Sequence, residues 1–120
     1  NVTWKYKKGP LVQKNSKLAF DLRIKACQLG SVSACSLIAA EYEKGGEGII
    51  PDSIRAFEYF GYACRMDWST SCSKYADYLT TGRAGTQNKQ LGIDLHRRLC
   101  SKSSFSPSCK KLDEYGVSRN

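Results

Sequence analysis

Six cysteines are the residues of this sequence whose type and spacing point most directly to chemistry. They stand in three close pairs, 8, 8 and 9 positions apart: Cys27 and Cys35, Cys64 and Cys72, Cys100 and Cys109. Such pairs form disulfides, bind a metal or remain buried thiols. Zinc ligands normally stand two to four residues apart, and none of these pairs does. The only histidine, His96, lies beside Arg97 and Arg98, whose charges oppose a cation. We expect no metal and no other cofactor.

Helix geometry indicates which cysteines pair. Residues eight apart on one helix are separated by about 12 Å, whereas a disulfide joins Cα atoms about 4.4 to 6.8 Å apart, so a turn must lie between the two cysteines. The sequence supplies a turn in each interval, at residues 29–31, 67–69 and 103–107. Of roughly 15 connectivities open to six cysteines, we predict Cys27 with Cys35, Cys64 with Cys72 and Cys100 with Cys109. Buried free thiols remain the alternative.

Two serines stand three residues before a lysine, as the nucleophile of penicillin-recognising enzymes does. They are Ser71 with Lys74 and Ser108 with Lys111. With 14 Ser and 12 Lys among 120 residues, about 1.4 such pairs arise by chance. The supporting Ser-Asp-Asn and Lys-Thr-Gly motifs do not occur. We therefore predict no enzyme and assign no catalytic residue.

The cysteine pairs mark an internal repeat. Corresponding cysteines recur every 36 or 37 residues, and small residues (Ala19, Ala56 and Gly92) stand eight positions before the first cysteine of each pair. A period of this size is typical of a repeat architecture in which each unit packs on its neighbours. We predict one repeat domain over residues 1–120, with approximate units 6–44, 45–82 and 83–116.

Apolar spacing predicts helices throughout and no convincing strand. The first expected helix ends near Gly30, and the second runs from Ser31 to Lys44. The third begins at Asp52 or Ser53, and the fourth runs from a capping Ser69 to near Gly82. The last two cover residues 88–101 and 106–115. Trp4 and Tyr6 look like the end of one further helix whose start is missing, which indicates a processed chain or one cut from a longer array.

Composition and charge exclude several classes of protein. Hydrophobic residues make up 41% and charged residues 25% of the chain, which is typical of a folded domain. The longest apolar run is four residues, so we expect no membrane span. The net charge of +8 divides into +6 over residues 1–25, −3 over 41–58 and +6 over 83–111. Such separate basic ends do not form the continuous stripe that nucleic acid requires, and they favour a partner protein with an acidic surface.

One stretch of the chain resembles a known repeat family. Residues 39–52 (AAEYEKGGEGIIPD), followed by Arg55–Phe60 (RAFEYF) and by Ala63 and Cys64, resemble a Sel-1-like repeat. The closely spaced cysteines in each copy resemble its disulfide-rich branch, typified by the Helicobacter cysteine-rich proteins. The resemblance covers about residues 6–116. It implies an all-α, right-handed α-solenoid of antiparallel helical hairpins related to tetratricopeptide repeats, with a disulfide joining the two helices of each hairpin.

The resemblance also implies function. Members of the family serve mainly as protein-binding scaffolds or adaptors, and the cysteine-rich branch is periplasmic or secreted. Some relatives look like immunity proteins for exported toxins, so we expect a partner-binding scaffold that could serve as an immunity or inhibitor protein. Others have been labelled β-lactamases or penicillin binders. The alternatives are therefore a β-lactam-binding or β-lactamase-like protein and an adaptor in secretion or assembly. In such arrays the first helix of each hairpin forms an inner wall, and we expect residues two, five, six and nine positions beyond the second cysteine of each pair to line it. The expected partner-binding residues are Glu41, Lys44, Lys74, Asp77, Tyr78, Thr81, Lys111, Glu114 and Tyr115.

Overall fold

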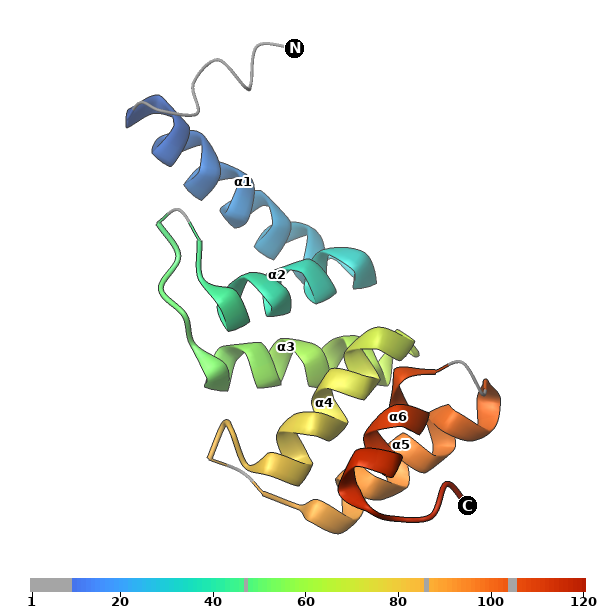
Figure 1. Ribbon diagram of the computed structural model, residues 1–120. Helices are drawn as coiled ribbons and strands as arrows, with labels where there is room; N and C mark the ends of the chain where they lie inside the picture. The colour runs from blue at the N-terminus through green and yellow to red at the C-terminus, as the bar shows by residue number, and fades with distance from the viewer. Residues whose placement is uncertain (1–9, 47, 86, 104–105) are drawn as a thin grey trace. The chain divides into compact units, whose positions relative to one another are not determined.

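The computed structural model describes residues 10–46, 48–85, 87–103 and 106–120, with residues 10–15 described by their backbone alone (Figure 1). This part of the chain contains six helices: α1 (Pro10–Gln28), α2 (Val32–Lys44), α3 (Ser53–Arg65), α4 (Ser69–Thr81), α5 (Lys89–Lys102) and α6 (Pro107–Tyr115). Apart from them it holds one isolated β-bridge, between Gly46 and Ile49. The predicted all-α class is confirmed. The suggested helix end at Trp4 and Tyr6 lies outside the described residues.

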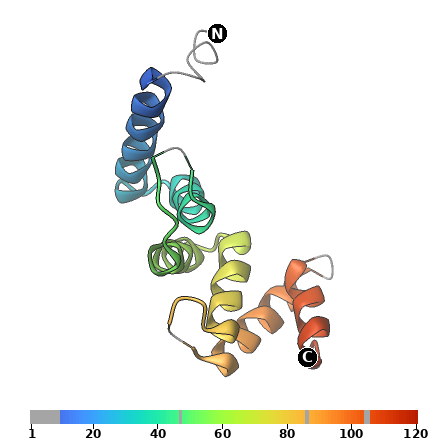
Figure 2. The ribbon, with the colours of Figure 1, turned by 60° about the vertical axis from the view of Figure 1, so that its left-hand side comes forward.

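The chain forms two compact units, residues 1–59 and 60–120, which divide within α3. In the first unit α1 packs against α2, and in the second α5 packs against both α4 and α6 (Figures 1 and 2). The single repeat domain over 1–120, with units 6–44, 45–82 and 83–116, stays a prediction.

Three disulfides join the two helices on either side of a turn, as predicted. Their Cα–Cα distances are 4.8 Å for Cys27–Cys35, 4.4 Å for Cys64–Cys72 and 4.9 Å for Cys100–Cys109. All six cysteines are therefore paired. Each bond closes a short loop of eight or nine residues, which restricts the unfolded chain and fixes the two helices beside their connection.

Local sequence explains most helix starts. Ser31, Asn88 and Ser106 cap α2, α5 and α6, each through a side-chain oxygen that accepts a backbone N–H bond. Asp52 does the same for α3, accepting from the backbone N–H of Arg55 at 3.0 Å. The prediction that Ser69 caps α4 is wrong by one residue.

Small residues allow the helices of the second unit to approach closely. A Cβ added at Gly92 of α5 would lie 2.5 Å from Cγ2 of Thr80 and 2.7 Å from the backbone oxygen of Ala76, both on α4. Ala56, eight positions before Cys64, is likewise fully buried. One of the small residues that recur in the sequence, Gly92, therefore lies where α5 closely approaches α4.

The loop between α2 and α3 is tied down by backbone contacts. Gly45 ends α2 with a φ of 77°, and a Cβ there would meet the Pro51 ring at 2.6 Å. The backbone N–H of Asp52 returns to the carbonyl oxygen of Tyr42 at 2.7 Å. The loop is thus held against the end of α2 before α3 begins.

Candidate functional site

Polar side chains from α4, α5 and α6 meet around the carboxylate of Asp77 in the second unit. The Tyr115 hydroxyl donates to Oδ1 of Asp77 at 2.5 Å, and the same hydroxyl lies 2.9 Å from Oγ1 of Thr80. Nζ of Lys111 is 3.4 Å from Oδ2 of Asp77, and Nε2 of His96 is 3.4 Å from Oδ1. We call these five residues the Asp77 cluster.

The cluster shifts the ionisation of two of its members. Burial alone raises the pKa of Asp77, but the nearby ring of His96, the hydrogen bond from Tyr115 and the charge of Lys111 outweigh it, so this pKa lies below its ordinary value. Burial, followed by the hydrogen bond to Asp77, raises the pKa of Tyr115 to about 12. Asp77 is therefore a carboxylate, and Tyr115 a neutral donor, at neutral pH.

His96 forms the buried end of the cluster. Its side chain is fully buried, and Nδ1 lies 2.8 Å from the hydroxyl of Ser108. That hydroxyl donates its single proton to Ser73 at 3.2 Å, so it accepts the bond from His96. Among the described residues Nε2 has no hydrogen-bond partner, although it faces Asp77.

Asp77, His96 and Ser108 have the composition of a hydrolase triad, but the serine is out of reach of a substrate. Ser108 is fully buried, and so is Ser71, the other serine that precedes a lysine by three. Both stand immediately before the second cysteine of their pair, where the first hairpin has the buried Ala34. The serine-lysine pairs therefore coincide with a helix-packing position of the repeat.

The predicted wall residues are partly brought together. In the second unit, Asp77 of α4 meets Lys111 and Tyr115 of α6, and Glu114 lies 3.8 Å from Lys111. Other predicted residues are exposed: Lys74 and Thr81 on α4 and, in the first unit, Lys44 at the end of α2.

Tyr78 corrects the predicted wall, because its side chain is fully buried and presents nothing to a partner. Its ring lies 5.9 Å from that of Phe60 and 4.5 Å below the guanidinium of Arg83. Glu41, the equivalent residue of the first hairpin, is held by Arg23, whose Nε donates to Oε1 of Glu41 at 2.8 Å. The position six residues after the second cysteine therefore faces the preceding helix.

Sequence reasoning missed the roles of Arg23 and His96, and it weighed Ser108 only as a possible nucleophile. His96 was weighed only as a metal ligand, although residues 92, 93, 96, 99 and 100 recur at helical spacing on one buried face of α5. That periodicity was the available signal. Within the described residues, no group of three or more His, Cys, Asp or Glu side chains is placed to hold a metal ion.

The first unit contributes an open hollow of about 380 Å³ between α1 and the α2–α3 loop. Its floor includes the buried Phe20, which contacts Tyr42 edge to face at 5.3 Å. Its lining also includes charged side chains of both signs: Lys17, Asp21, Asp52 and Arg55.

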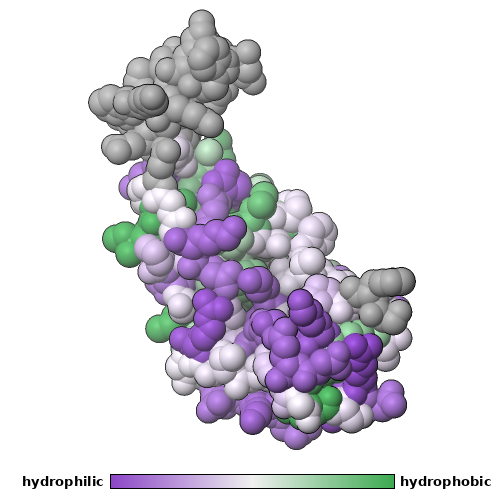
Figure 3. All heavy atoms as spheres, in the orientation of Figure 1, coloured by the Kyte–Doolittle hydropathy of each residue, from purple (hydrophilic) through white to green (hydrophobic). Residues whose placement is uncertain are grey.

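On the face shown in Figure 3, hydrophilic residues gather over α5 and α6 of the second unit. None of the helices in the described residues is long and apolar enough to cross a bilayer.

Solved structures with the same fold are known. Cysteine-rich protein B of Helicobacter pylori is 23% identical, with a TM-score of 0.70 over 81% of this chain and 71% of that one. A Sel1 repeat protein from Oxalobacter formigenes is 21% identical, with a TM-score of 0.74 over 99% of this chain, which spans 50% of the length of that protein. No protein-family model and no curated protein matches the sequence. The structural likeness confirms the predicted resemblance and the Sel1-repeat solenoid fold.

Proposed function

We propose that the protein is a non-catalytic scaffold that binds a partner protein through the exposed side of the Asp77 cluster. The observation that carries this proposal is the ion pair between Asp77 of α4 and Lys111 of α6. It joins side chains from two successive hairpins in one half-exposed polar surface, which continues to Glu114. Repeat proteins use such extended surfaces for binding.

Two further features favour a protein partner over a small substrate. The serines with lysines three residues later are buried, which disfavours the β-lactam-binding alternative. The hollow of the first unit is open and combines an apolar floor with charges of both signs, which suits a segment of a protein. The net charge of +8 favours a partner with an acidic surface, because complementary charge raises the association rate.

The partner surface is tested with variants of α6. A partner isolated from the source organism by crosslinking is purified, and its affinity for the wild type is compared with that for Lys111→Ala and Glu114→Ala. We expect each variant to weaken binding about 5-fold to 10-fold. Lys110→Ala, at an exposed position of the same helix, is the matched control. Equal affinity of all four proteins would exclude this surface.

An oxidising compartment, periplasmic or extracellular, is part of the proposal because three disulfides persist only where thiols are not kept reduced. Cell fractionation with immediate thiol alkylation tests it: we expect six unreactive cysteines in a periplasmic or secreted fraction. Reactive thiols on a cytoplasmic protein would contradict it.

Within this function we propose an immunity or inhibitor role toward an exported toxin, with an adaptor in secretion or assembly as the alternative. An immunity protein forms a tight complex with one toxin, whereas an adaptor binds an assembly component more weakly. Co-expression with the product of the adjacent gene distinguishes them: protection of the host from that product supports immunity, and weak binding without protection supports the adaptor.

A further inference from the structure

The turn between α3 and α4 has less favourable local chemistry than the same turn in the first hairpin. There, Gly30 has a φ of 105° and Ser31 caps α2 through its side chain. The equivalent positions hold Asp67, with a φ of 66°, and Trp68, which occupies the N-cap position of α4 without a side-chain cap bond. Residues with a Cβ rarely adopt a positive φ, and Trp cannot supply a cap.

The two turns are otherwise the same. In the first hairpin the backbone N–H of Ser31 bonds the carbonyl oxygen of Ala26 at 3.0 Å, and in the second Trp68 bonds Ala63 at 3.1 Å. Because the backbone path is shared, Gly and Ser would fit at positions 67 and 68. The backbone of the turn favours Gly at position 67 and a capping residue at position 68, so it does not explain the presence of Asp67 and Trp68. Residues that go against such local preferences concentrate at functional sites.

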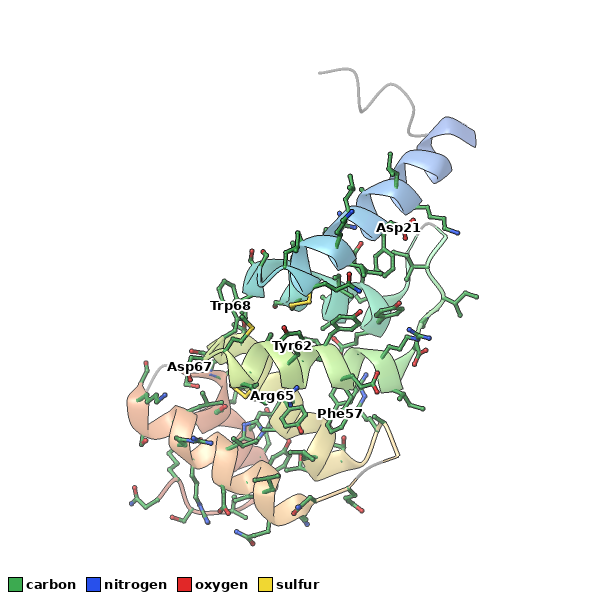
Figure 4. All side chains as sticks on the ribbon, turned by 180° about the vertical axis from the view of Figure 1, so that it is seen from behind. Asp21, Phe57, Tyr62, Arg65, Asp67 and Trp68 are labelled. Carbon is green, nitrogen blue, oxygen red and sulfur yellow. A yellow bond between two sulfur atoms is a disulfide. The ribbon has the colours of Figure 1, made fainter. Side chains whose placement is uncertain are left out.

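The side chains around this turn form an exposed patch. Trp68 is 40% exposed, and Tyr62 and Met66 are each 37% exposed. Arg65 is exposed and places its guanidinium 5.9 Å from the centre of the Tyr62 ring. Figure 4 shows Tyr62, Arg65, Asp67 and Trp68 at the end of α3 and in the turn that follows it. We call Tyr62, Arg65, Met66, Asp67 and Trp68 the turn patch.

The composition of the turn patch is that of a binding hot spot. Trp, Tyr and Arg are the residue types that carry most energy at protein interfaces, and Met is enriched there. Within the described residues neither Arg65 nor Asp67 forms an ion pair or a hydrogen bond through its side chain, so both are available to a partner. The patch lies apart in sequence from the helix α6 that carries Lys111.

Charge identifies the kind of partner. Residues 60–120 carry ten Lys or Arg against five Asp or Glu, a net charge of +5. Within the described residues Arg65 forms no ion pair, and Trp68 and Met66 add apolar surface to the patch. We infer that the turn patch is a second docking surface, for a partner protein segment that places an aromatic or aliphatic side chain on Trp68 and Met66 and an acidic side chain on Arg65.

Asp67 completes this geometry. Its carboxylate lies in the turn between Arg65 and Trp68, where it accepts hydrogen bonds from backbone N–H groups of the bound segment. A glycine would remove that acceptor. The positive φ of Asp67 is thus tolerated at a position where the side chain makes a contact in the complex.

The probe for this inference is a phage-displayed library of random 12-residue peptides, selected on the full wild-type chain. We expect the enriched peptides to share an aromatic or aliphatic residue next to Asp or Glu. Synthetic copies should bind Trp68→Ser about 30-fold and Arg65→Gln about 10-fold more weakly than the wild type. Trp68→Ser restores the cap residue of the first hairpin, so weakened binding by this variant does not reflect a lost fold.

Leu91→Ser is the matched control, because Leu91 is 43% exposed on α5, outside the turn patch. Two outcomes overturn the inference: no peptide of this kind is enriched, or the enriched peptides bind Trp68→Ser and Leu91→Ser equally. A third arm adds vesicles of phosphatidylglycerol and phosphatidylcholine. A blue shift of Trp68 fluorescence with vesicles and none with the peptides, measured in a Trp4→Phe background, would identify a lipid surface and also overturn it.

Discussion

His96 packs its ring 5.7 Å from the ring of Tyr115 across the last hairpin, at the repeat positions where Phe60 and Tyr78 meet at 5.9 Å one hairpin earlier. In both cases the first residue stands four positions before one cysteine and the second stands six positions after its partner. The disulfide therefore fixes the register of a neighbouring side-chain pair. The chemistry of that pair differs between hairpins, with two aromatic rings in one and a hydrogen-bonded cluster in the other.

The first hairpin uses an ion pair at the same positions, between Arg23 and Glu41. Because their side chains are 31% and 28% exposed, we expect Glu41→Ala to cost only about 0.5 to 1 kcal/mol in free energy of unfolding. The double variant Arg23→Phe/Glu41→Tyr copies the second hairpin and should be at least as stable as the wild type. Urea denaturation measures both.

Glu58→Ala, at an exposed position of α3 in the same unit, is the control for Glu41→Ala. A double aromatic variant less stable than Glu41→Ala would show that the hairpins do not share one register.

The parts of the fold that local chemistry decides could be predicted from the sequence. Cysteine spacing with an intervening turn predicts all three disulfides, and cap residues such as Asp52 locate helix starts. The wall residues were only partly predictable. Tyr78 and Glu41 both stand six residues after the second cysteine of their pair. The apolar periodicity of their own helix predicts that this position is exposed, but its side chain faces a residue on the preceding helix. That contact depends on how the two helices cross. His96 was missed because its burial depends on partners from α4 and α6.

Removing the hydroxyl of Tyr115 should destabilise the second unit. Tyr115→Phe removes the hydrogen bond that the hydroxyl donates to Asp77. A hydrogen bond to a charged group contributes about 1.5 to 3 kcal/mol, so we expect a loss near the lower value for this half-buried pair. Tyr62→Phe, which keeps the ring at an exposed position, is the control and should change stability by less than about 0.5 kcal/mol. Thermal denaturation at pH 7 measures both variants.

Tyr115 also predicts a pH dependence. Its folded-state pKa of about 12 lies above the ordinary value of 10.0, so its contribution to stability is complete below pH 10 and is lost as pH rises through 12. Absorbance at 295 nm, as the difference between wild type and Tyr115→Phe, should show phenolate formation near pH 12. A difference titration centred at pH 10 would contradict the proposed hydrogen bond to Asp77.

Stability should depend on oxidation. Closing a loop of eight or nine residues contributes about 2.5 kcal/mol per disulfide in the chain-entropy description, so reduction by dithiothreitol should lower the melting temperature strongly. The double variant Cys64→Ser/Cys72→Ser should lose about one third of that effect. A melting temperature unchanged by reductant, with six free thiols counted by a chromogenic thiol reagent, would contradict the stabilising role.

Gly92→Ala should destabilise the protein although alanine favours helices. The helix-propensity gain is about 1 kcal/mol, whereas the new Cβ meets the backbone oxygen of Ala76, which cannot move aside as a flexible side chain can, and overpacking costs about 1 to 3 kcal/mol. Arg98→Ala, at an exposed position of the same helix, is the control. Increased stability of Gly92→Ala in urea denaturation would show that α4 and α5 are not packed as described.

The turn patch predicts a stability gain from Asp67→Gly. Glycine adopts the φ of 66° without strain, so we expect an increase of about 0.5 to 1 kcal/mol in free energy of unfolding. The reciprocal variant Gly30→Asp places the same side chain at a φ of 105° in the first hairpin and should destabilise by at least as much. Both are measured by urea denaturation. If Asp67→Gly gains stability and weakens peptide binding, the side chain at position 67 serves the interface at the expense of the stability of the turn. A loss of stability in Asp67→Gly would instead mean that the Asp67 side chain stabilises the turn.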